Sequence, residues 1–442
     1  MSSVSIASLI DQSDSMKSFG YMEPAKTDAA TFITIMKESD QIGVVAFSTE
    51  SRVIYPLKTI HSDHKTINEA INEIKKLRPI YLTNIEQAIS QGHQMLNVAG
   101  NANRAMILLS DGLWTAGGDP LKGLPSDIPI YTIALGDRGQ CSVLQELARR
   151  TNGQYHFSPD AFELAEIYNQ IADDASVATT AINRKQQIDS YRFTTLPLYV
   201  PGGSDHVSLA VNWLDESVTY TTGTPGENQV NILLRDPDGQ KIVMPPTFIG
   251  NGFVTFHLHD PKPGQWTTGC WCGNMRQNVF RGTVGAFEPN STIKLNCKLA
   301  DTDMNCGDYL DIKTALRSNK EEIGNVIIKT TLESPVNSKD YILEKYKNEI
   351  MNTEPDEELM KKGVNEIDAK LNTLHKRLSP NVNIFARRQN PVHAEYSRDG
   401  VEHEPIKLDV SGNHTIRVDV EGTILRSNTK FTRTRRLSVN VK

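Results

Sequence analysis

The segment Asp11-Gln12-Ser13-Asp14-Ser15 places carboxylates and hydroxyls within five residues, directly after an apolar run. Another acidic residue, Asp111, follows a second apolar run, and Thr83 opens a helical pattern between them. The carboxylates of Asp11 and Asp111 and the hydroxyls of Ser13, Ser15 and Thr83 are all oxygen donors. Hard cations prefer such donors, so the set predicts a site for Mg²⁺, with Mn²⁺ or Ca²⁺ as alternatives.

The two acidic positions lie at the ends of predicted buried strands. The runs 4–10 and 105–110 are almost continuously apolar, as in strands that are buried on both faces. Helical periodicities alternate with strand-like runs over the first 175 residues, which predicts a doubly wound, mainly parallel, Rossmann-like sheet. Ligands of such sheets bind beyond the carboxyl ends of the strands, where the winding reverses. We therefore expect the five oxygen donors to converge there.

Such a donor set has a chemical consequence for binding. Hydroxyl ligands are neutral, so a divalent cation held by them keeps positive charge and open coordination positions. It should therefore accept a carboxylate from another molecule. Asp-x-Ser-x-Ser alone also fits an ordinary loop and helix cap, because Ser and Asp favour both roles. The presence of Thr83 and Asp111 favours the metal site.

This arrangement resembles the metal-ion-dependent adhesion site of a von Willebrand factor type A (VWA) domain, over roughly residues 3–178. The resemblance implies that Ser13, Ser15 and Thr83 bind the metal directly, while Asp11 and Asp111 act directly or through water. Two positions depart from the family pattern. Leu82 stands where glycine often precedes the threonine, and Asp14 replaces a small residue, adding a carboxylate at the rim.

The rest of the chain has a different texture. From about residue 191, turn signals separate short alternating runs, which predicts a β-sandwich over 191–290, after a VWA domain at 1–180. We expect Trp266 and Trp271 to fill the core of this sandwich. Residues 291–442 predict a second sandwich that carries a helical hairpin at about 338–378, with a heptad-like apolar seam from Met360 to Leu378. The expected fold is thus α/β followed by two Ig/fibronectin-like sandwiches.

The later segments loosely resemble calcium-activated chloride channel regulator-like proteins. The similarity rests on Asp236-Pro237-Asp238-Gly239, on the segment 260–266 and on Arg433-Thr434-Arg435-Arg436. Those proteins also carry a zinc-protease unit. No His-Glu-x-x-His occurs in this sequence, so the resemblance does not imply protease activity.

Composition excludes several classes of function. The 442 residues are 38% hydrophobic and 23% charged, which fits a globular chain. With 47 basic and 53 acidic residues the net charge is −6, so we expect no nucleic-acid partner. No apolar run reaches the ~18 residues of a membrane-spanning helix. The first residues lack the pattern of a secretory signal, so we expect a cytoplasmic protein or one exported without an N-terminal signal.

Two further groups of residues leave alternatives open. Cys270, Cys272, Cys297 and Cys306 could be reduced thiols, two disulfides or a zinc site; we favour reduced thiols, because the C-x-C spacing is unusual for structural zinc. A basic stretch near residues 426–442 fits a strand edge protected from sheet pairing better than an anionic-lipid or phosphate patch.

These observations favour a non-enzymatic adhesion or adaptor protein that captures an Asp or Glu side chain of a protein partner through Mg²⁺. One alternative is a secreted or injected membrane-acting or host-targeting protein that uses the helical hairpin, so membrane contact stays open. A metal-dependent hydrolase is less favoured, because no His or Glu adjoins the motif as a base. The sequence does not identify the partner or the oligomeric state.

Overall fold

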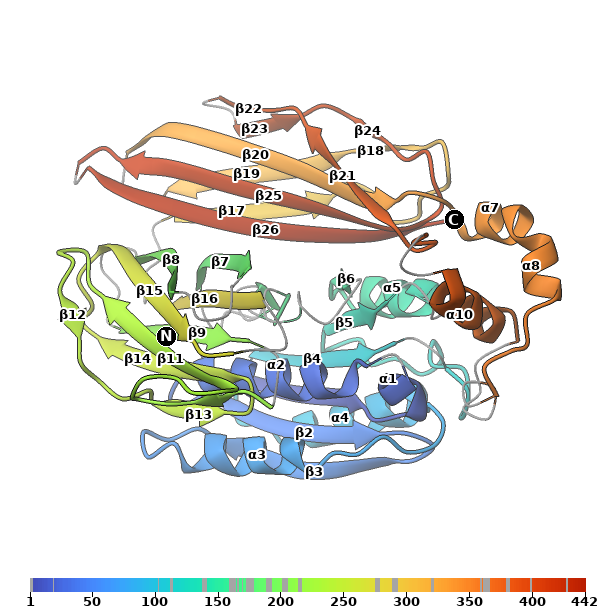
Figure 1. Ribbon diagram of the computed structural model, residues 1–442, viewed down its shortest axis with the longest axis horizontal. Coiled ribbons are helices and arrows are strands. Elements are labelled where there is room, and N and C mark those ends of the chain that lie inside the picture. Colours follow the sequence, from blue (N-terminus) through green and yellow to red (C-terminus); the bar gives the residue numbers. More distant parts are fainter. Residues whose placement is uncertain are drawn as a thin grey trace.

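The structure is a computed structural model. It describes residues 3–18, 20–101, 103–111, 114–136, 141–158, 164, 167–168, 170–171, 179–187, 193–200, 206–213, 217–274, 279–287, 293–318, 322–357, 360, 366–378, 382–397, 400–426 and 428–442. The chain forms three regions, which are the lower, left-hand and upper parts of Figure 1. No helix among these residues is long and apolar enough to cross a membrane.

The first region is built on a six-stranded sheet of order β3-β2-β1-β4-β5-β6. Its strands are β1 (Val4–Asp11), β2 (Gln41–Phe47), β3 (Ser51–Thr59), β4 (Asn103–Ser110), β5 (Ile130–Leu135) and β6 (Tyr155–Ser158). β2 and β3 pair antiparallel and all other pairs are parallel. The winding reverses at β1, because β2 lies on one side of it and β4 on the other. The mainly parallel, doubly wound sheet predicted from the sequence is confirmed.

Helices cover both faces of this sheet. They are α1 (Asp14–Ser18), α2 (Met22–Ile35), α3 (Lys65–Lys75), α4 (Ile85–Asn97) and α5 (Cys141–Arg150). The apolar side chains of α2 and α3 join one core cluster, and those of α4 and α5 join the other. Strand residues alternate between the two clusters, as in β1, where Ile6 faces the first and Ala7 the second. The helices lie where the apolar periodicity predicts them.

The second region contains two further sheets, of order β10-β11-β15-β8, with β12 beside β11, and β13-β14-β9-β16-β7. Their strands are β7 (Thr179–Gln187), β8 (Phe193–Val200), β9 (His206–Asn212), β10 (Thr219–Tyr220), β11 (Gln229–Arg235), β12 (Lys241–Ile242), β13 (Phe248–Gly250), β14 (Phe253–His259), β15 (Gly264–Cys272) and β16 (Val279–Phe287). Apolar residues of both sheets, including Leu198 and Val254, share one core cluster. That this second region has an Ig-like or fibronectin-like fold stays a prediction.

Two features of this region differ from the sequence-based expectation. β7 pairs with β16, so the second region begins with a strand that lies before residue 191. Trp266 is buried in the core as expected, but Trp271 is only half-buried, and the fully buried tryptophan is Trp213. Trp213 donates its indole N–H to the carbonyl of Val218 at 3.0 Å, which satisfies its one polar atom inside the core.

The third region has sheets of order β17-β19-β23-β22 and β21-β20-β25-β26, and the short pair β18-β24. Its strands are β17 (Ile293–Leu299), β18 (Tyr309–Leu310), β19 (Ile312–Ser318), β20 (Ile323–Pro335), β21 (Arg387–Val392), β22 (Ala394–Ser397), β23 (Gly400–His403), β24 (Ile406–Lys407), β25 (Gly412–Ile424) and β26 (Thr429–Val441). A single core cluster joins the two larger sheets. The alternation at Val382–Phe385 predicts a strand there, which is wrong: Ile384 and Phe385 form a turn, and β21 begins at Arg387.

Between β20 and β21 the described residues form α7 (Lys339–Lys345), α8 (Lys347–Met351) and α10 (Glu366–Leu378), which project at the right of Figure 1. We call residues 339–378 the insertion. Leu371 and Leu374 of the predicted seam are buried, but Met360 and Ile367 are exposed. Residues 358–359 and 361–365 lie outside the described residues, and the two-armed hairpin stays a prediction.

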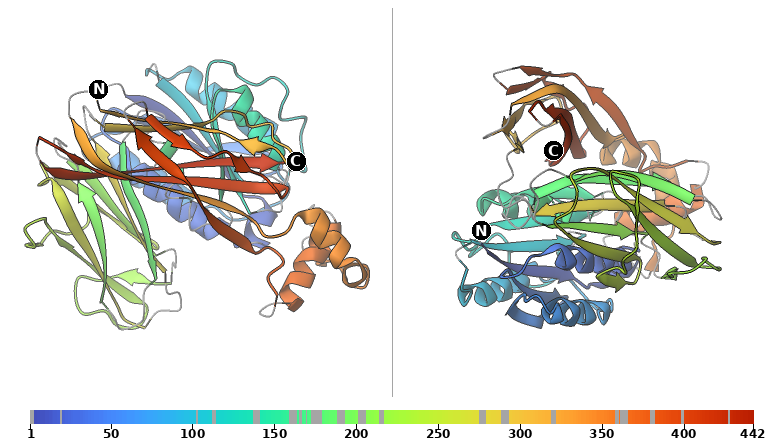
Figure 2. Two further views of the ribbon diagram at one scale, coloured as in Figure 1. Left: turned by 90° about the horizontal axis from the view of Figure 1, so that it is seen from above. Right: turned by 90° about the vertical axis from the view of Figure 1, so that its left-hand side faces the viewer.

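The first region contacts both others (Figure 2). α2 packs against β9, β13 and β14 of the second region, and β26 of the third region packs against β6 and α5. The predicted basic strand edge falls on β26, which is the end strand of its sheet, but its residues Arg433, Arg435 and Arg436 are buried. Arg433 and Arg435 donate to the β17 carbonyls of Ile293 and Leu295 at 3.0 and 2.8 Å, so they bridge the two sheets.

Candidate metal site

The sheet brings the two acidic positions of the motif to one edge. Ile10 pairs with Leu109 in the parallel β1–β4 ladder, so Asp11 and Ser110 end the two strands at the same level. Asp111 follows immediately. This edge is the switch point of the winding, because β1 lies between β2 and β4. The topology therefore places both carboxylates where a doubly wound sheet binds its ligands.

The loop after β1 is folded around the Asp11 carboxylate. Asp11 Oδ1 accepts the backbone N–H of Ser13 at 2.8 Å, and Asp11 Oδ2 accepts the hydroxyl of Ser110 at 2.6 Å. The hydroxyl oxygens of Ser13 and Ser15 lie 3.0 Å apart. The turn at Ser13 leads directly into α1, which begins at Asp14. Three of the predicted donors thus share one compact loop.

Thr83 lies on a neighbouring loop that is tied to the other two. The carbonyl of Tyr81 accepts the N–H of Asp14 at 3.1 Å. The N–H of Thr83 donates to the Thr115 hydroxyl at 3.0 Å, and the carbonyl of Thr83 accepts the N–H of Thr115 at 3.1 Å. The Asn84 side chain then caps α4 by accepting the N–H of Gln87 at 3.1 Å. Backbone bonds therefore hold Thr83 between the loops that carry the serines and Asp111.

The residue before Thr83 does not carry the unusual backbone of this loop. Tyr81 has a φ of 58°, a left-handed conformation that costs energy in a residue with a side chain. Leu82 instead donates its N–H to the Thr49 hydroxyl at 3.3 Å. The left-handed residue of this loop is therefore Tyr81. Leu82, where the family pattern often has glycine, is the next residue along the chain.

Burial gives the site its electrostatic character. Asp11, Ser13, Ser15, Thr83 and Asp111 are each 2% exposed or less. Burial and the nearby charge of Asp111 raise the pKa of Asp11 from 3.8 to about 7, against the lowering effect of its hydrogen bonds from Ser110 and Ser13. Two carboxylates thus repel each other in a poorly solvated place.

The donor set fits a hard divalent cation. A cation between Asp11 and Asp111 would replace their repulsion by attraction, and the buried hydroxyls are suitable neutral ligands. No group of three or more His, Cys, Asp and Glu residues that could hold a metal occurs in the described part of the chain. The candidate site is not such a group, because it has only the two carboxylates of Asp11 and Asp111 and its other predicted ligands are hydroxyls.

Two supporting residues were not singled out from the sequence. Ser110 orients the Asp11 carboxylate, and Thr115 holds the backbone of Thr83. Ser110 is the residue before the predicted ligand Asp111, at the strand end, and this position was a usable signal. Thr115 gave no signal, because its role depends on two loops that meet only in the folded chain.

The cysteines do not gather into one cluster in space. Cys270 and Cys272 lie on β15 with sulfur atoms 3.2 Å apart, whereas Cys297 lies on β17 in another core and Cys306 is exposed. All five cysteines of the chain are free thiols in the structure. The absence of a structural zinc site stays a prediction.

The fold and the loop geometry together define an α/β domain whose acidic and hydroxyl residues lie at the switch point of the sheet. Residues 5–170 match the von Willebrand factor type A domain family, and this part of the chain is a VWA domain. No curated protein matches the chain significantly.

Several solved structures are similar. A von Willebrand factor type A protein from Catenulispora acidiphila is 15% identical, with 72% of this chain and 63% of that chain covered and a TM-score of 0.37. The vWF domain of the type V pili tip protein Mfa5 from Porphyromonas gingivalis is also 15% identical, with 40% and 96% covered and a TM-score of 0.34. Proximal thread matrix protein 1 from the mussel byssus is 17% identical, with 42% and 50% covered and a TM-score of 0.34. The chain thus spans less than two thirds of the first and third of these proteins.

Proposed function

We propose that this chain is a non-enzymatic, metal-dependent protein-binding protein. Its VWA domain would hold Mg²⁺ through Asp11, Ser13, Ser15, Thr83 and Asp111, and would capture an Asp or Glu side chain of a partner. The observation that carries the proposal is the pair of buried carboxylates, Asp11 and Asp111, facing a common edge with hydroxyl donors around them. Such a pair is costly without a cation.

The ligand types support capture of a carboxylate rather than catalysis. When bound, Mg²⁺ would keep net positive charge and supply an open position for an oxygen ligand. The neighbouring residues Lys17 and Tyr81 are exposed, so the loops that carry the site reach the protein surface. Lys17, two residues after Ser15 on α1, adds positive charge to this surface.

The metal part of the proposal is tested by titrating Mg²⁺ into the purified chain by calorimetry. Thr83→Ala removes one neutral ligand and should weaken Mg²⁺ binding by about tenfold or more, because water must replace the hydroxyl. Asp11→Ala removes a charge and should weaken it further. Both variants should keep the wild-type circular dichroism spectrum, and Thr83→Ala should cost about 1 kcal/mol of folding free energy or less.

Asp14→Ala is the matched control for these variants. Asp14 carries a carboxylate in the same loop, but it is half-buried at the rim and is not among the proposed ligands. Its removal should leave Mg²⁺ affinity within about twofold, since it alters only a nearby charge. Wild-type affinity in Thr83→Ala would show that the hydroxyl of Thr83 is not a ligand.

The partner-binding part needs a separate experiment. The chain, immobilised with Mg²⁺, should retain a protein from its native source, and a chelator should release that protein. Thr83→Ala should retain less of it than Asp14→Ala does at the same Mg²⁺ concentration. A protein retained equally with and without chelator would contradict metal-dependent capture, even if Mg²⁺ binds as proposed.

A further inference from the structure

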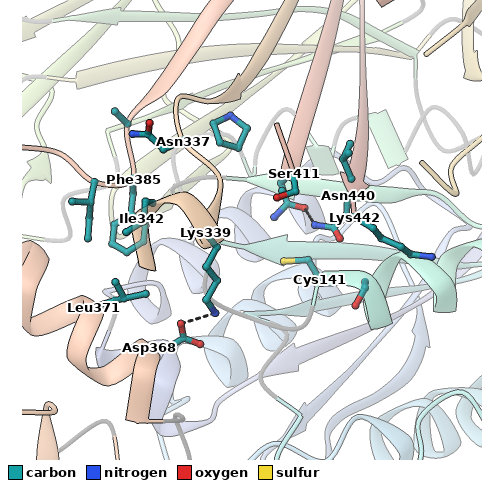
Figure 3. Close-up of a pocket in the computed structure, with 17 residues that line it drawn as sticks. Cys141, Asn337, Lys339, Ile342, Asp368, Leu371, Phe385, Ser411, Asn440 and Lys442 are labelled. Carbon is teal, nitrogen blue, oxygen red and sulfur yellow. Dashed lines mark hydrogen bonds and ion pairs between the residues drawn. The ribbon is translucent and has the colours of Figure 1, made fainter. Parts of the chain in front are cut away.

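A cavity of about 320 Å³ lies where the insertion meets the rest of the molecule. Four parts of the chain line it: the insertion, the residues that flank it in sequence (335–337 and 384–386), the start of α5 in the VWA domain, and the adjoining ends of β25 and β26. Figure 3 shows Ile342, Leu371 and Phe385 on one side of it, with Cys141 and Ser411 on the other. The cavity is distinct from the candidate metal site. It is not lined by any of the five predicted ligands, which are Asp11, Ser13, Ser15, Thr83 and Asp111.

One wall of the cavity is apolar. Ile342 and Leu371 are 5% and 2% exposed, and Ile384 is 2% exposed. These three side chains belong to the insertion's own small core cluster, and Phe385 packs against the same cluster. The cavity thus offers a hydrocarbon surface, as ligand pockets usually do. Its volume equals that of about ten water molecules at ~30 Å³ each, which fits a small molecule rather than a protein segment.

The polar side chains that line the cavity are two lysines, one aspartate, and amides and hydroxyls that can both donate and accept. Lys339 Nζ lies 2.7 Å from the carboxylate of Asp368, which is 7% exposed. An ammonium has three N–H donors, and this carboxylate needs only one of them. The side chains of Asn337 and Ser411 also line the cavity, and neither makes a hydrogen bond to another residue that the structure describes. Lys339 therefore has N–H donors beyond the one that its ion pair needs, and the side chains of Asn337 and Ser411 can donate to the same ligand. A second lysine of the lining, Lys442, pairs with Asp303 at 2.5 Å.

We propose that this cavity binds a small amphipathic carboxylate. The hydrocarbon body would pack on Ile342, Leu371 and Phe385, and the carboxylate would accept hydrogen bonds from Lys339 and from Asn337 or Ser411. Lys339 keeps its ion pair with Asp368 in this arrangement, so no buried charge loses its partner. A bound ligand would join the insertion to the VWA domain, since both form the walls.

Octanoate is the probe, and 1-octanol is the uncharged molecule of matching length. Octanoate should bind the full chain with a Kd of about 1 mM, which is reasonable for a ligand of this size. The alcohol should bind about tenfold more weakly, because it lacks the charge-assisted hydrogen bond to Lys339. Calorimetry measures both affinities.

Cys141 reports whether the probe occupies this cavity. Its thiol lines the wall at the start of α5, so a ligand should shield it from alkylation by iodoacetamide. Saturating octanoate should slow the alkylation of Cys141 by about fivefold or more, with the exposed Cys306 as the internal reference. Mass spectrometry of the peptides separates the two thiols.

Lys339→Met should remove the preference for the charged probe and bring the two affinities within about threefold. Lys347→Met makes the same change on α8, where Lys347 is exposed and outside the cavity lining, and it should keep the preference. If Lys339→Met fails to fold because the buried carboxylate of Asp368 loses this ion pair, the double variant with Asp368→Asn removes both charges together. The proposal is wrong if octanoate fails to shield Cys141, or if the folded Lys339 variant still prefers the acid.

Discussion

The candidate metal site and the contact between β6 and β26 are both buried polar clusters. They differ in whether hydrogen-bond donors face acceptors or like charges face each other. At the contact, Arg436 donates to the carbonyl of Phe157 at 3.1 Å, and the side chain of Gln170 both donates to and accepts from the Arg436 backbone, at 2.7 and 2.8 Å. At the candidate metal site, two carboxylates face each other and repel. Donors mainly meet acceptors at the first place, although both ring nitrogens of His156 have no hydrogen-bond partner among the described residues, and like charges meet at the second.

This difference separates a structural role from a binding role. Matched donors and acceptors lower the free energy of the folded chain by themselves, and need no ligand. Like charges brought together in a buried place raise that free energy until a cation joins them. The comparison therefore predicts opposite outcomes when a charge is removed from each place.

Asp111→Asn should give the largest effect. The change keeps the size of the side chain but removes one negative charge, so Mg²⁺ affinity should fall by about 100-fold or more. In Mg²⁺-free buffer the same variant should be as stable as wild type or more stable by about 1 kcal/mol, because the repulsion with Asp11 is gone. Calorimetry and urea unfolding measure the two quantities. A clear loss of stability without metal would show that the Asp111 carboxylate stabilises the fold by itself, which would contradict its role as a metal ligand.

Arg436→Met should act in the opposite direction. Arg436 is 3% exposed and bonds the carbonyl of Phe157 across the contact, so its removal should cost about 3 kcal/mol of unfolding free energy. Mg²⁺ affinity should not change. Arg426→Met removes the same charge from an exposed position, and should stay within about 0.5 kcal/mol of wild type. Equal stabilities for the two variants would show that the contact contributes little.

His156 makes the same contact sensitive to pH. It is fully buried on β6, and burial, together with the charges of Arg436 and Arg435, lowers its pKa from 6.5 to about 3. The unfolded chain therefore takes up a proton below pH 6.5 that the folded chain refuses, so stability falls as the pH falls. Between pH 7 and pH 5, protonation of His156 in the unfolded chain should lower the unfolding free energy by about 2 kcal/mol.

Urea unfolding at both pH values tests this prediction. His156→Phe should lose about that much less stability between pH 7 and pH 5 than wild type does, because it cannot take up the proton. His61→Phe is the control, since His61 is exposed, and it should keep the wild-type pH dependence. An unchanged pH dependence in His156→Phe would mean that the buried ring does not control it.

The first region could be predicted from the sequence because its signals are local. The apolar run of β1 and the three- and four-residue spacing of α4 each specify an element, and parallel topology then brings Asp11 and Asp111 together. Distances from Thr83 to the other donors could not be predicted, because they depend on bonds between loops such as that from Thr83 to Thr115.

The later regions were harder to predict, because their chemistry depends on distant partners. β7 reads Thr-Thr-Ala-Ile-Asn-Arg-Lys-Gln-Gln, which lacks an alternating apolar pattern, and it forms a strand by pairing with β16. The charges of Arg433 and Arg435 predicted a basic strand edge, but β17 carbonyls 140 residues earlier accept their N–H groups. Sequence periodicity does not report such partners.

Replacing the insertion, residues 339–378, by a short Gly/Ser linker should have the smallest effect on the VWA domain. Its buried residues Ile342, Ile350, Leu371 and Leu374 form a cluster of their own with Ile384, separate from both cores of the first region. The unfolding free energy of the VWA domain should therefore change by about 0.5 kcal/mol or less, and Mg²⁺ affinity should be unchanged. Differential scanning calorimetry of the two chains measures this. Unfolding of the whole shortened chain at a much lower temperature would show instead that the cavity wall shared with α5 stabilises the VWA domain, which would make the insertion a structural element like the β6–β26 contact.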